Sequence, residues 1–369
     1  MKKVVVAMSG GVDSSVALHL IKQQGFDPIG LFMKNWEEDE EGPCSAAQDF
    51  EDVASVCEKL QVPYYAVNFS KEYYNLVFQD FLEGYKAGLT PNPDILCNRE
   101  IKFKYLLEKA LEMGADFLAT GHYARNIDGQ LMRGLDGNKD QSYFLYTLSS
   151  SILSKVLFPV GALAKTEVRQ IAKDLGLSTA HKKDSTGICF VGKRDFRPFL
   201  GKYLQAKTGP LHTLSGKYVG DHEGAAYYTL GQRKGLGIGG AGEPWFVVGK
   251  DMEKNIVFVE QGDHPALYHQ GLIAGTVSWV SGHAPSSSFR ATAKIRYRQM
   301  DAACQVVCLD NGTVDVLFDQ AQKAITPQQS IVFYQGDICL GGAMITSSYN
   351  PFPTSLLPCT DRRHLHLVE

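Results

Sequence analysis

The sequence predicts an α/β domain built on a parallel sheet, then a small β-rich domain, then a C-terminal antiparallel β-barrel. Up to about residue 200, short β-branched or aromatic runs alternate with longer segments of helical period, which is typical of a parallel α/β sheet. After Gln205–Pro210, which reads as a linker, the helical periods disappear. We therefore expect three domains, at residues 1–204, 205–270 and 271–369.

In the first domain, β-branched and aromatic runs predict four strands, at Val4–Met8, Ile29–Met33, Tyr64–Asn68 and Phe117–Thr120. Apolar residues at helical spacing predict a helix after the first strand that stops near Gly25. The same pattern predicts helices at Ala46–Leu60, Lys71–Lys86, Ile101–Met113 and Thr166–Leu175. We expect Thr166 to be an N-cap and Gly176 to lie just past a helix end.

In the last domain, longer alternating runs predict the barrel. They lie at Leu272–Val280, Phe289–Tyr297, Cys304–Leu309, Val314–Phe318, Ile331–Tyr334 and Ile338–Ile345. Asn311-Gly312 is a natural hairpin turn between two of these strands. Cys304 and Cys308 are at an even spacing on one strand, so both are expected to face the barrel core, and Cys57 is expected in the core of a helix.

Composition excludes several classes of protein. The 369 residues are 44% hydrophobic and 21% charged, which fits a globular chain and neither a disordered nor a fibrous one. The net charge of −3 means that any nucleic-acid surface is a local patch. The eight cysteines form no C-x-x-C pair, and no window is long enough for a membrane span, so we expect reduced thiols in the cytoplasm and no membrane partner.

The strongest functional signal is Ser9-Gly10-Gly11-Val12-Asp13-Ser14-Ser15, directly between the first strand and the first helix. Glycines let the backbone approach a ligand closely, and a helix N-terminus presents free N–H groups to phosphate. Asp13 can hold a magnesium ion that accompanies a nucleotide. The loop lacks the Gly-Lys-Ser/Thr ending of a Walker A loop, so ordinary NTPase chemistry is not implied. A glycine turn without a ligand is the alternative.

Two further positions fall at the ends of predicted parallel strands. Met33 ends the second strand, and Thr120-Gly121-His122 follows the fourth. Open α/β sheets bind ligands at these carboxyl ends, so three strand ends are expected to converge on one crevice. Taken singly, each signal is weak. A methionine at the position of Met33 is more often a core residue than a ligand contact, and a histidine after a strand, such as His122, is more often a hydrogen-bonded structural residue.

Eight segments carry a resemblance to a known family. The chain resembles the bacterial tRNA-specific 2-thiouridylases, which are ATP-dependent adenylating enzymes with a pyrophosphatase-type loop. Besides the Ser9–Ser14 loop, the matching segments are Leu31–Trp36, Thr90–Asn98, Thr120–Tyr123, Asn138–Phe144, Lys183–Phe190, Leu230–Gly235 and Arg296–Arg298. The resemblance covers nearly the whole chain and implies an adenine-nucleotide alpha-hydrolase-like first domain.

The resemblance implies that the wobble uridine of glutamate, glutamine and lysine tRNAs is adenylated at C2 and then receives sulfur, giving 2-thiouridine, AMP and pyrophosphate. It implies ATP and Mg²⁺ as cofactors, with Asp13 as the candidate metal contact. The nucleotide-binding positions that match the family pattern are Ala7, Met8, Ser9, Gly10, Gly11, Val12, Asp13, Ser14, Met33 and Gly121.

Two cysteines are catalytic by the same resemblance, which also marks Asp94 as catalytic. Cys189 is implied to carry a persulfide, and Cys97 to be the second thiol, which forms a transient disulfide with Cys189 as sulfur is released. From the residues alone, Cys97 is expected near a helix N-terminus, because Pro91 and Pro93 enforce a loop before a helix that starts near Arg99. For Cys189, composition alone favours a buried, inert cysteine, because Ile188 and Phe190 flank it in a short apolar run.

The resemblance also implies tRNA contacts and a protein that donates persulfide sulfur, either a sulfur relay protein or a cysteine desulfurase. Asn92-Pro93-Asp94 is expected against the target base, and Lys139-Asp140-Gln141 and Arg296-Tyr297 against tRNA. Lys294, Arg296 and Arg298 alternate, which predicts a positive stripe on one strand face, or else an ordinary solvated face. We expect a monomer.

Two motifs are set aside, and two rival classes stay open. Gly235, Gly237 and Gly240 satisfy G-x-G-x-x-G, but a proline and a strand-like run follow where a dinucleotide site needs a helix, so we expect a flexible loop near substrate. The acidic run Glu37–Glu41 is expected to be a solvated loop. The rivals are an amide- or lysidine-forming enzyme with the same ATP loop, and a non-catalytic tRNA-binding or sulfur-relay protein.

Overall fold

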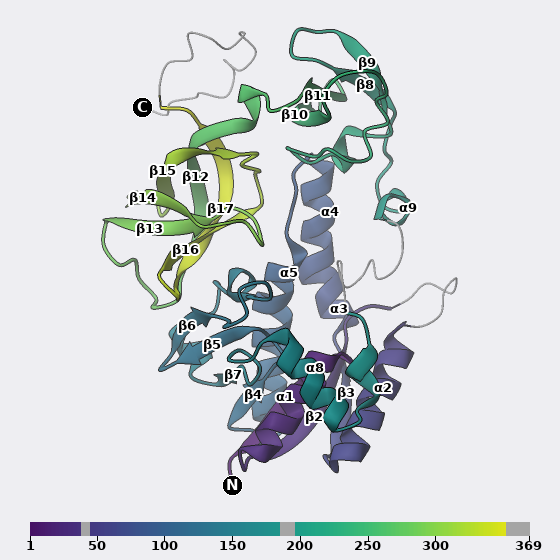
Figure 1. Cartoon of the computed structure of the whole chain (residues 1–369), viewed down its shortest axis with the longest axis vertical. Coiled ribbons are helices and arrows are strands. Elements are labelled where there is room, and N and C mark those ends of the chain that lie inside the picture. The colour runs from purple at the N-terminus through teal and green to yellow at the C-terminus, as the bar shows by residue number, and fades with distance from the viewer. Residues whose placement is uncertain (38–44, 185–195, 352–369) are drawn as a thin grey trace.

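The computed structural model describes residues 1–37, 45–184 and 196–351 (Figure 1). Its N-terminal part is a parallel sheet of five strands in the order β3-β2-β1-β4-β7. Their bounds are β1 Lys3–Met8, β2 Asp27–Lys34, β3 Tyr64–Asn68, β4 Phe117–Ala119 and β7 Val156–Leu157. The four strands predicted in this region are therefore confirmed. The short strand β7 was not predicted.

Helices cover both faces of this sheet because alternate residues of a strand point to opposite sides. Val4, Val6 and Met8 of β1 pack in the core cluster that also holds residues of α1 (Val12–Gln23), α2 (Ser45–Leu60) and α8 (Lys165–Asp174). Val5 packs on the other side with residues of α6 (Leu107–Glu112). The sheet is thus buried on both faces, as a parallel sheet requires.

Two predicted helices are longer runs interrupted by π-helical turns. The first consists of α3 Ser70–Tyr73, η1 Tyr74–Phe78 and α4 Gln79–Lys86. The second begins eight residues before the predicted start and consists of α5 Pro93–Leu96, η2 Cys97–Leu106 and α6. The N-cap predicted at Thr166 was wrong: Ala164 is the N-cap, and its N–H donates to Glu167 Oε2 at 2.6 Å. Gly25 and Gly176 both follow helix ends with positive φ, as predicted.

A β-hairpin that the sequence analysis missed joins the first domain to the barrel. It consists of β5 (Ala124–Ile127) and β6 (Gln130–Arg133), with Asp128-Gly129 at the turn. Both turn residues have positive φ, and Asp-Gly is a hairpin signal that was available in the sequence. Met132 pairs with Ile338 of the barrel, so one eight-stranded sheet spans the two domains.

The central region is a four-stranded sheet in the order β10-β11-β8-β9. Its strands are β8 Gly209–His212, β9 Tyr218–His222, β10 Trp245–Asp251 and β11 Ile256–Gln261, and α9 (Phe196–Gly201) precedes them. Further short helical elements are η3 Ser142–Phe144, α7 Ser150–Leu153, η4 Ser178–His181, η5 Ala225–Tyr227 and η6 Pro265–Leu267.

The C-terminal part is a closed antiparallel barrel of six strands, as predicted. The strands run in the order β12-β15-β14-β13-β16-β17, and pairing of β12 with β17 closes the ring. They are β12 Tyr268–Trp279, β13 Ser288–Lys294, β14 Ala302–Cys308, β15 Val314–Lys323, β16 Ser330–Gln335 and β17 Ile338–Tyr349. Closure leaves no free sheet edge within the ring. The domain limits at 204 and 270 stay predictions.

Within the described ranges, no helix is long and apolar enough to cross a membrane.

The packing between the hairpin and the loop after β7 generates a stability prediction. A Cβ at Gly161 would overlap the carbonyl oxygen of Ala124, which is backbone and cannot move aside. Gly161→Ala should therefore destabilise the protein by about 3 kcal/mol, as overpacked core positions do. The measurement is the thermal melting temperature. Gly137→Ala is the control, since nothing lies within 4 Å of that position, and a melting temperature lowered equally in both variants would contradict the packing argument.

Candidate functional site

The loop between β1 and α1 leaves the first N–H groups of the helix unsatisfied by side chains. Gly10 has a φ of +70°, and Gly11, the N-cap, has no side chain to accept their hydrogen bonds. The N–H of Ser9 donates to Ser14 Oγ at 3.2 Å, and Ser14 Oγ donates to the Gly11 carbonyl at 3.1 Å. These bonds hold the loop in a turn at the uncapped N-terminus of the helix. An anion is the natural partner of such a turn.

Two close backbone contacts fix this loop against its neighbours. A Cβ at Gly10 would lie 2.6 Å from the carbonyl oxygen of Asp49 in α2. A Cβ at Gly121, just after β4, would lie 2.7 Å from the backbone nitrogen of Ser14. The ends of β1 and β4 therefore meet at the N-terminus of α1, as predicted. Met33, near the end of β2 on the other side of β1, packs against the same sheet core.

A network of charged side chains lies beside the loop. The Nζ of Lys165 is 2.7 and 2.8 Å from the two oxygens of Asp13 and 2.8 Å from Asp184 Oδ1. Asp184 also pairs with Lys139 at 2.6 Å and Arg169 at 2.7 Å. Sequence reasoning gave no role to Lys165, Arg169 or Asp184. Only Asp184 gave a signal, since it lies in a segment that matches the family.

Electrostatics in this network favours an ionised Asp184 and a neutral Tyr123. Desolvation opposes ionisation of Asp184, but hydrogen bonds from Lys139 and Lys165 outweigh it and lower its pKa to about 2. The hydroxyl of Tyr123 donates to Asp13 Oδ1 at 2.8 Å. Desolvation, with the adjacent Asp13 charge, raises the pKa of Tyr123, so it remains a donor.

The fit of these residues to Mg²⁺ rests on Asp13. It is the carboxylate of the loop, and both its oxygens are bound by Lys165. Among the residues that the structure describes, no group of three or more histidine, cysteine or acidic side chains is placed to hold a metal. Asp13 thus fits the pattern in which one carboxylate and nucleotide phosphates share Mg²⁺, and not an all-protein metal site.

His122 comes directly after Gly121 at the end of β4, and its ring is held in place. Its Nδ1 is 2.8 Å from Thr120 Oγ1, and its ring contacts those of Phe103 and Phe158. Desolvation, with a contribution from Lys102, lowers the pKa of His122 well below its ordinary value. The imidazole is therefore neutral at pH 7.

Cys97 lies in the interior of a helical run, and not near its start as expected. The run begins at Pro93, where the N-cap Asn92 accepts a hydrogen bond from the N–H of Asp94. The N-terminus therefore lies six residues before Arg99, near which the sequence placed it, because Pro93 occupies the first helical position. Only 2% of the Cys97 surface is exposed. It packs in an aromatic cluster against which Met33 also packs, so this cluster connects Cys97 to the carboxyl end of β2.

The other described cysteines are poor nucleophiles. Burial raises the pKa values of Cys57, Cys304 and Cys339 to about 12, which keeps these thiols protonated. Cys57 and Cys304 lie in hydrophobic cores and Cys308 packs against the barrel core, as predicted. Cys189, the expected persulfide carrier, lies outside the described residues, as do Cys44 and Cys359.

The expected target-base segment sits at the start of this helical run. Pro93 is buried, and Asn92 and Asp94 are partly exposed. Desolvation raises the pKa of Asp94, although the charge of Lys102 acts in the opposite direction. A carboxyl of this kind holds a proton more readily than an exposed one.

The side chains of Lys139, Asp140 and Gln141 have partners inside the chain. Lys139 pairs with Asp184, and the buried Asp140 accepts hydrogen bonds from the N–H groups of Gly134 and Ser142. Gln141 Oε1 accepts from the N–H of Tyr123 at 2.9 Å. These three side chains shape the loop that carries them.

The basic stripe predicted on the barrel was wrong. The strand β13 ends at Lys294, and Arg298 has a φ of +64° in the following turn. The Nη2 of Arg296 donates to the carbonyls of Leu230 and Ala324 and to the hydroxyl of Thr326, so it joins the central region to the barrel. Because the strand stops early, the three basic residues do not share a face.

Tyr297, next to Arg296, reaches towards the first domain. Its ring lies 4.5 Å from that of Phe144, whose carbonyl accepts a hydrogen bond from Asn98. Asn98 follows Cys97 directly in the chain. Tyr297 therefore contacts Phe144, and Phe144 in turn binds the helix that carries Cys97.

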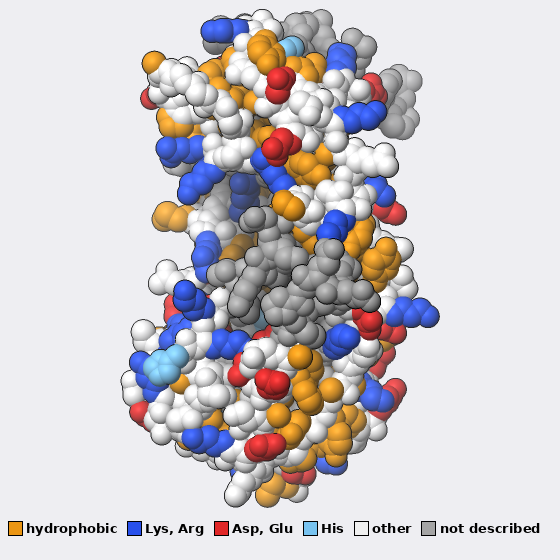
Figure 2. Space-filling view, turned by 90° about the vertical axis from the view of Figure 1, so that its right-hand side faces the viewer, with side chains coloured by type: hydrophobic (Ala, Val, Ile, Leu, Met, Phe, Trp, Pro, Cys, Tyr) orange, Lys and Arg blue, Asp and Glu red, His pale blue; other side chains and the backbone are white. Residues whose placement is uncertain are grey.

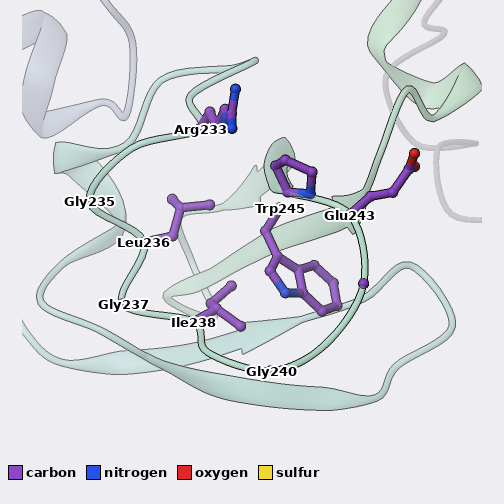
Figure 3. Close-up of a pocket in the computed structure, with 10 residues that line it drawn as sticks. Arg233, Gly235, Leu236, Gly237, Ile238, Gly240, Glu243 and Trp245 are labelled. Atoms are coloured by element: carbon purple, nitrogen blue, oxygen red, sulfur yellow. The ribbon is translucent and has the colours of Figure 1, made fainter.

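The glycine-rich loop of the central region lines a cavity of about 350 Å³ (Figure 3). Gly235, Gly237 and Gly240 have positive φ, and the strand β10 follows at Trp245. A dinucleotide site of the Rossmann type is therefore excluded here, as the sequence indicated. Of the acidic run, the structure describes only Glu37, which pairs with Lys34 at 3.6 Å.

The fold and the glycine loop at the carboxyl edge of the parallel sheet define a class of protein. Its members have an α/β domain with a glycine loop suited to a phosphate-bearing ligand, followed by two β domains. Three family models match the chain in that order. They are the tRNA methyl transferase HUP domain at residues 2–193, the tRNA methyl transferase PRC-barrel domain at 197–261 and the aminomethyltransferase beta-barrel domain at 269–345.

Curated relatives match over nearly the whole chain. A tRNA-specific 2-thiouridylase MnmA of Protochlamydia amoebophila is 60% identical, over 96% of this chain and 95% of its own. Proteins of the same name from Halalkalibacterium halodurans and Yersinia enterocolitica are 59% and 58% identical, covering 93% and 96% of this chain and 94% and 98% of their own. The chain belongs to the tRNA-specific 2-thiouridylase family.

The network around Asp184 generates a pH prediction. Its pKa falls from an ordinary 3.8 to about 2 in the folded protein. Its ionised form therefore stabilises the fold above pH ~4, and this contribution is lost as pH falls towards 2. Asp184→Asn should lower the melting temperature at pH 7, and the difference from wild type should narrow between pH ~4 and ~2. Asp310→Asn, in an exposed turn, is the control. A difference for Asp184→Asn that stays constant with pH would contradict the argument.

Proposed function

We propose that this protein is a tRNA 2-thiouridylase, an ATP-dependent tRNA-uridine sulfurtransferase acting on the wobble uridine of glutamate, glutamine and lysine tRNAs. The observation that carries the proposal is the uncapped N-terminus of α1 at the Gly10-Gly11 turn, packed against Gly121, in a chain of this family. We assign the nucleotide to Ala7–Ser14, Met33 and Gly121.

The first step activates a poor leaving group. The C2 oxygen of uridine attacks the α-phosphorus of ATP, so that an O–P bond forms and the bond to the β-phosphate oxygen breaks, releasing pyrophosphate. The N–H groups at the start of α1 are positioned to stabilise phosphate charge. Mg²⁺ neutralises the phosphates when bound, with Asp13 as its protein ligand.

The second step replaces oxygen by sulfur. The terminal sulfur of a Cys189 persulfide attacks C2, and the Cys97 thiolate then attacks the Sγ of Cys189. The bond from that Sγ to the transferred sulfur breaks, AMP leaves with the former C2 oxygen, and the two cysteines are left as a disulfide. The raised pKa of Asp94 makes it a candidate proton donor near the base.

Substrate and partners follow from the same proposal. Asn92, Pro93 and Asp94 contact the target base, and Lys139, Asp140, Gln141, Arg296 and Tyr297 are assigned to the tRNA surface. Figure 2 shows Lys and Arg side chains gathered along one side of the waist between the two halves of the molecule, a local patch that suits a phosphate backbone. A persulfide donor protein recharges a monomeric enzyme in the cytoplasm.

A gel test addresses the sulfur-transfer step directly. Wild-type protein with Mg-ATP, a persulfide source and unmodified glutamate or lysine tRNA should give a tRNA band that is retarded in a mercury gel. Cys189→Ser should give no retarded band, because the sulfur has no carrier. Cys308→Ser is the control and should behave as wild type, since that half-buried thiol has no role in the reaction. Equal retardation with Cys189→Ser would refute the proposed carrier.

The disulfide step predicts a limit on turnover. Without reductant or persulfide donor, an enzyme preloaded with persulfide should make about one 2-thiouridine per protein and then stop, because Cys97 and Cys189 are oxidised. Counting product per enzyme by mass spectrometry of digested tRNA tests this. Adding dithiothreitol with a sulfur source should restore turnover. Several turnovers without either addition would rule out the paired-thiol mechanism.

A further inference from the structure

A cavity of about 520 Å³ beside the carboxyl ends of β2 and β3 takes no part in the reaction as described so far. Its walls come from the residues that follow these strands, from the start of α3 and η1, and from the segment after α9. The lining includes three aromatic side chains, Trp36, Tyr74 and Tyr203, and two carboxylates, Glu37 and Glu72. Aromatic rings combined with carboxylates are surroundings that suit a cationic side chain.

The aromatic side chains form a connected wall. The rings of Trp36 and Tyr74 are stacked, with their centroids 6.2 Å apart. Phe78 lies behind them, since its ring centroid is 4.7 Å from that of Trp36 and 4.9 Å from that of Tyr203. Tyr74 is 40% exposed. A ring face carries the negative part of the aromatic quadrupole, so a wall of this kind attracts a cation from solvent.

The polar lining supplies hydrogen-bond acceptors. Ser70 is 8% exposed, and within the described part of the chain its hydroxyl has no hydrogen-bond partner. The N–H of Ser70 donates to Asn68 Oδ1 at 2.9 Å, which fixes this residue at the start of α3. Among the described lining residues, Lys71 is the one cation beside the carboxylates of Glu37 and Glu72. A guanidinium fits this set, because it stacks on aromatic rings and donates to a carboxylate and a hydroxyl together.

The cavity adjoins the cluster that encloses Cys97. Trp36 and Tyr203 both line the cavity and pack against the aromatic cluster in which Cys97 is buried. Tyr203 follows α9, which is the first described element after Cys189 in the chain. A protein bound at this cavity is therefore placed beside the thiol that we pair with the persulfide carrier.

A protein segment suits this cavity better than RNA does. Figure 1 shows α3 and α9 on one side of the molecule, and the β5–β6 hairpin and the barrel on the other. Lys139–Gln141 follow this hairpin and Arg296-Tyr297 belong to the barrel, so two of the three segments assigned to tRNA lie away from the cavity. The carboxylates of the lining also repel a phosphate backbone.

We propose that this cavity is the docking site of the persulfide donor protein and that it receives an arginine side chain of that protein. This inference rests on the proposed function and adds to it the surface that the donor uses. In the transfer, the thiolate of Cys189 attacks the terminal sulfur of the donor persulfide. A bond forms between Cys189 Sγ and that sulfur, the S–S bond of the donor breaks, and the donor cysteine leaves as a thiolate. The step consumes no oxidant or reductant.

The experiment follows sulfur transfer between the two proteins without tRNA. A cysteine desulfurase is charged with ³⁵S-cysteine, separated from free cysteine and mixed with the full-length protein without reductant, and the label on the protein is measured on non-reducing gels. Glu72→Lys should slow labelling about tenfold or more, because an ammonium replaces the carboxylate that binds the guanidinium. Tyr74→Ala should slow it about fivefold, through loss of the ring. Glu108→Lys is the matched control, a charge reversal at an exposed glutamate of α6, and should label at the wild-type rate.

Two further measurements separate docking from other roles. Sodium sulfide recharges Cys189 without a docked protein: the sulfide sulfur bonds to Cys189 Sγ, and Cys97 leaves the disulfide as a thiolate. With sulfide as the source, Glu72→Lys and Tyr74→Ala should therefore make 2-thiouridine in tRNA within about twofold of the wild-type rate. Glu72→Asp keeps the negative charge and should be labelled by the desulfurase within about threefold of wild type.

Several results would overturn the proposal. They are labelling of Glu72→Lys at the wild-type rate, equal slowing in Glu108→Lys, and no labelling of a wild-type protein that thiolates tRNA with sulfide. Loss of tRNA affinity by more than about fivefold in Tyr74→Ala, measured by filter binding, would also overturn it, because stacking of an RNA base would then explain the cavity. A wild-type protein that makes no 2-thiouridine with either sulfur source would instead refute the proposed function itself.

Discussion

The contact between Gly121 and the first turn of α1 is the constraint on which the site depends. With no Cβ at Gly121, the end of β4 lies against the backbone of Asp13 and Ser14. Gly10 allows a similar approach to α2 on the other side. The N-terminus of α1 is thereby held at the carboxyl edge of the sheet with its N–H groups uncapped. Lys165 of α8 lies beside it and binds Asp13. A side chain at either glycine would separate the elements to which we assign the phosphate.

The two β domains contact the first domain at Thr90 through a few specific hydrogen bonds. Gln329 of the barrel donates to the carbonyl of Thr90, and Thr229 of the central region bonds to the hydroxyl of Thr90, just before the segment assigned to the target base. Arg296 joins the same two domains. The barrel therefore supports the Asn92–Cys97 segment, so residues assigned to tRNA binding also fix the geometry of the first domain.

Sequence reasoning recovered most of what depends on local pattern, although it missed the Asp128-Gly129 hairpin, and it missed what depends on distant contacts. Four strands of the parallel sheet, the glycine loop and the barrel follow from residue periodicity and turn chemistry, so they could be predicted. Lys165 and Asp184 are remote from Asp13 in the chain, and no spacing rule brings them together. The start of the helix before Cys97 was misplaced because Pro93 was taken to end the loop when it occupies the first helical turn. Arg296 was assigned to an exposed strand because its carbonyl and hydroxyl partners lie in other segments.

The central claim is that the α1 N-terminus binds ATP and drives adenylation of tRNA, separately from sulfur transfer. The most direct measurement is pyrophosphate release from γ-labelled ATP by Cys189→Ser, with and without unmodified lysine tRNA. The account predicts tRNA-dependent release, because adenylation does not need the persulfide carrier. Failure of both this variant and the wild type to release pyrophosphate with any substrate tRNA would contradict the account and would favour a non-catalytic tRNA-binding or sulfur-relay protein.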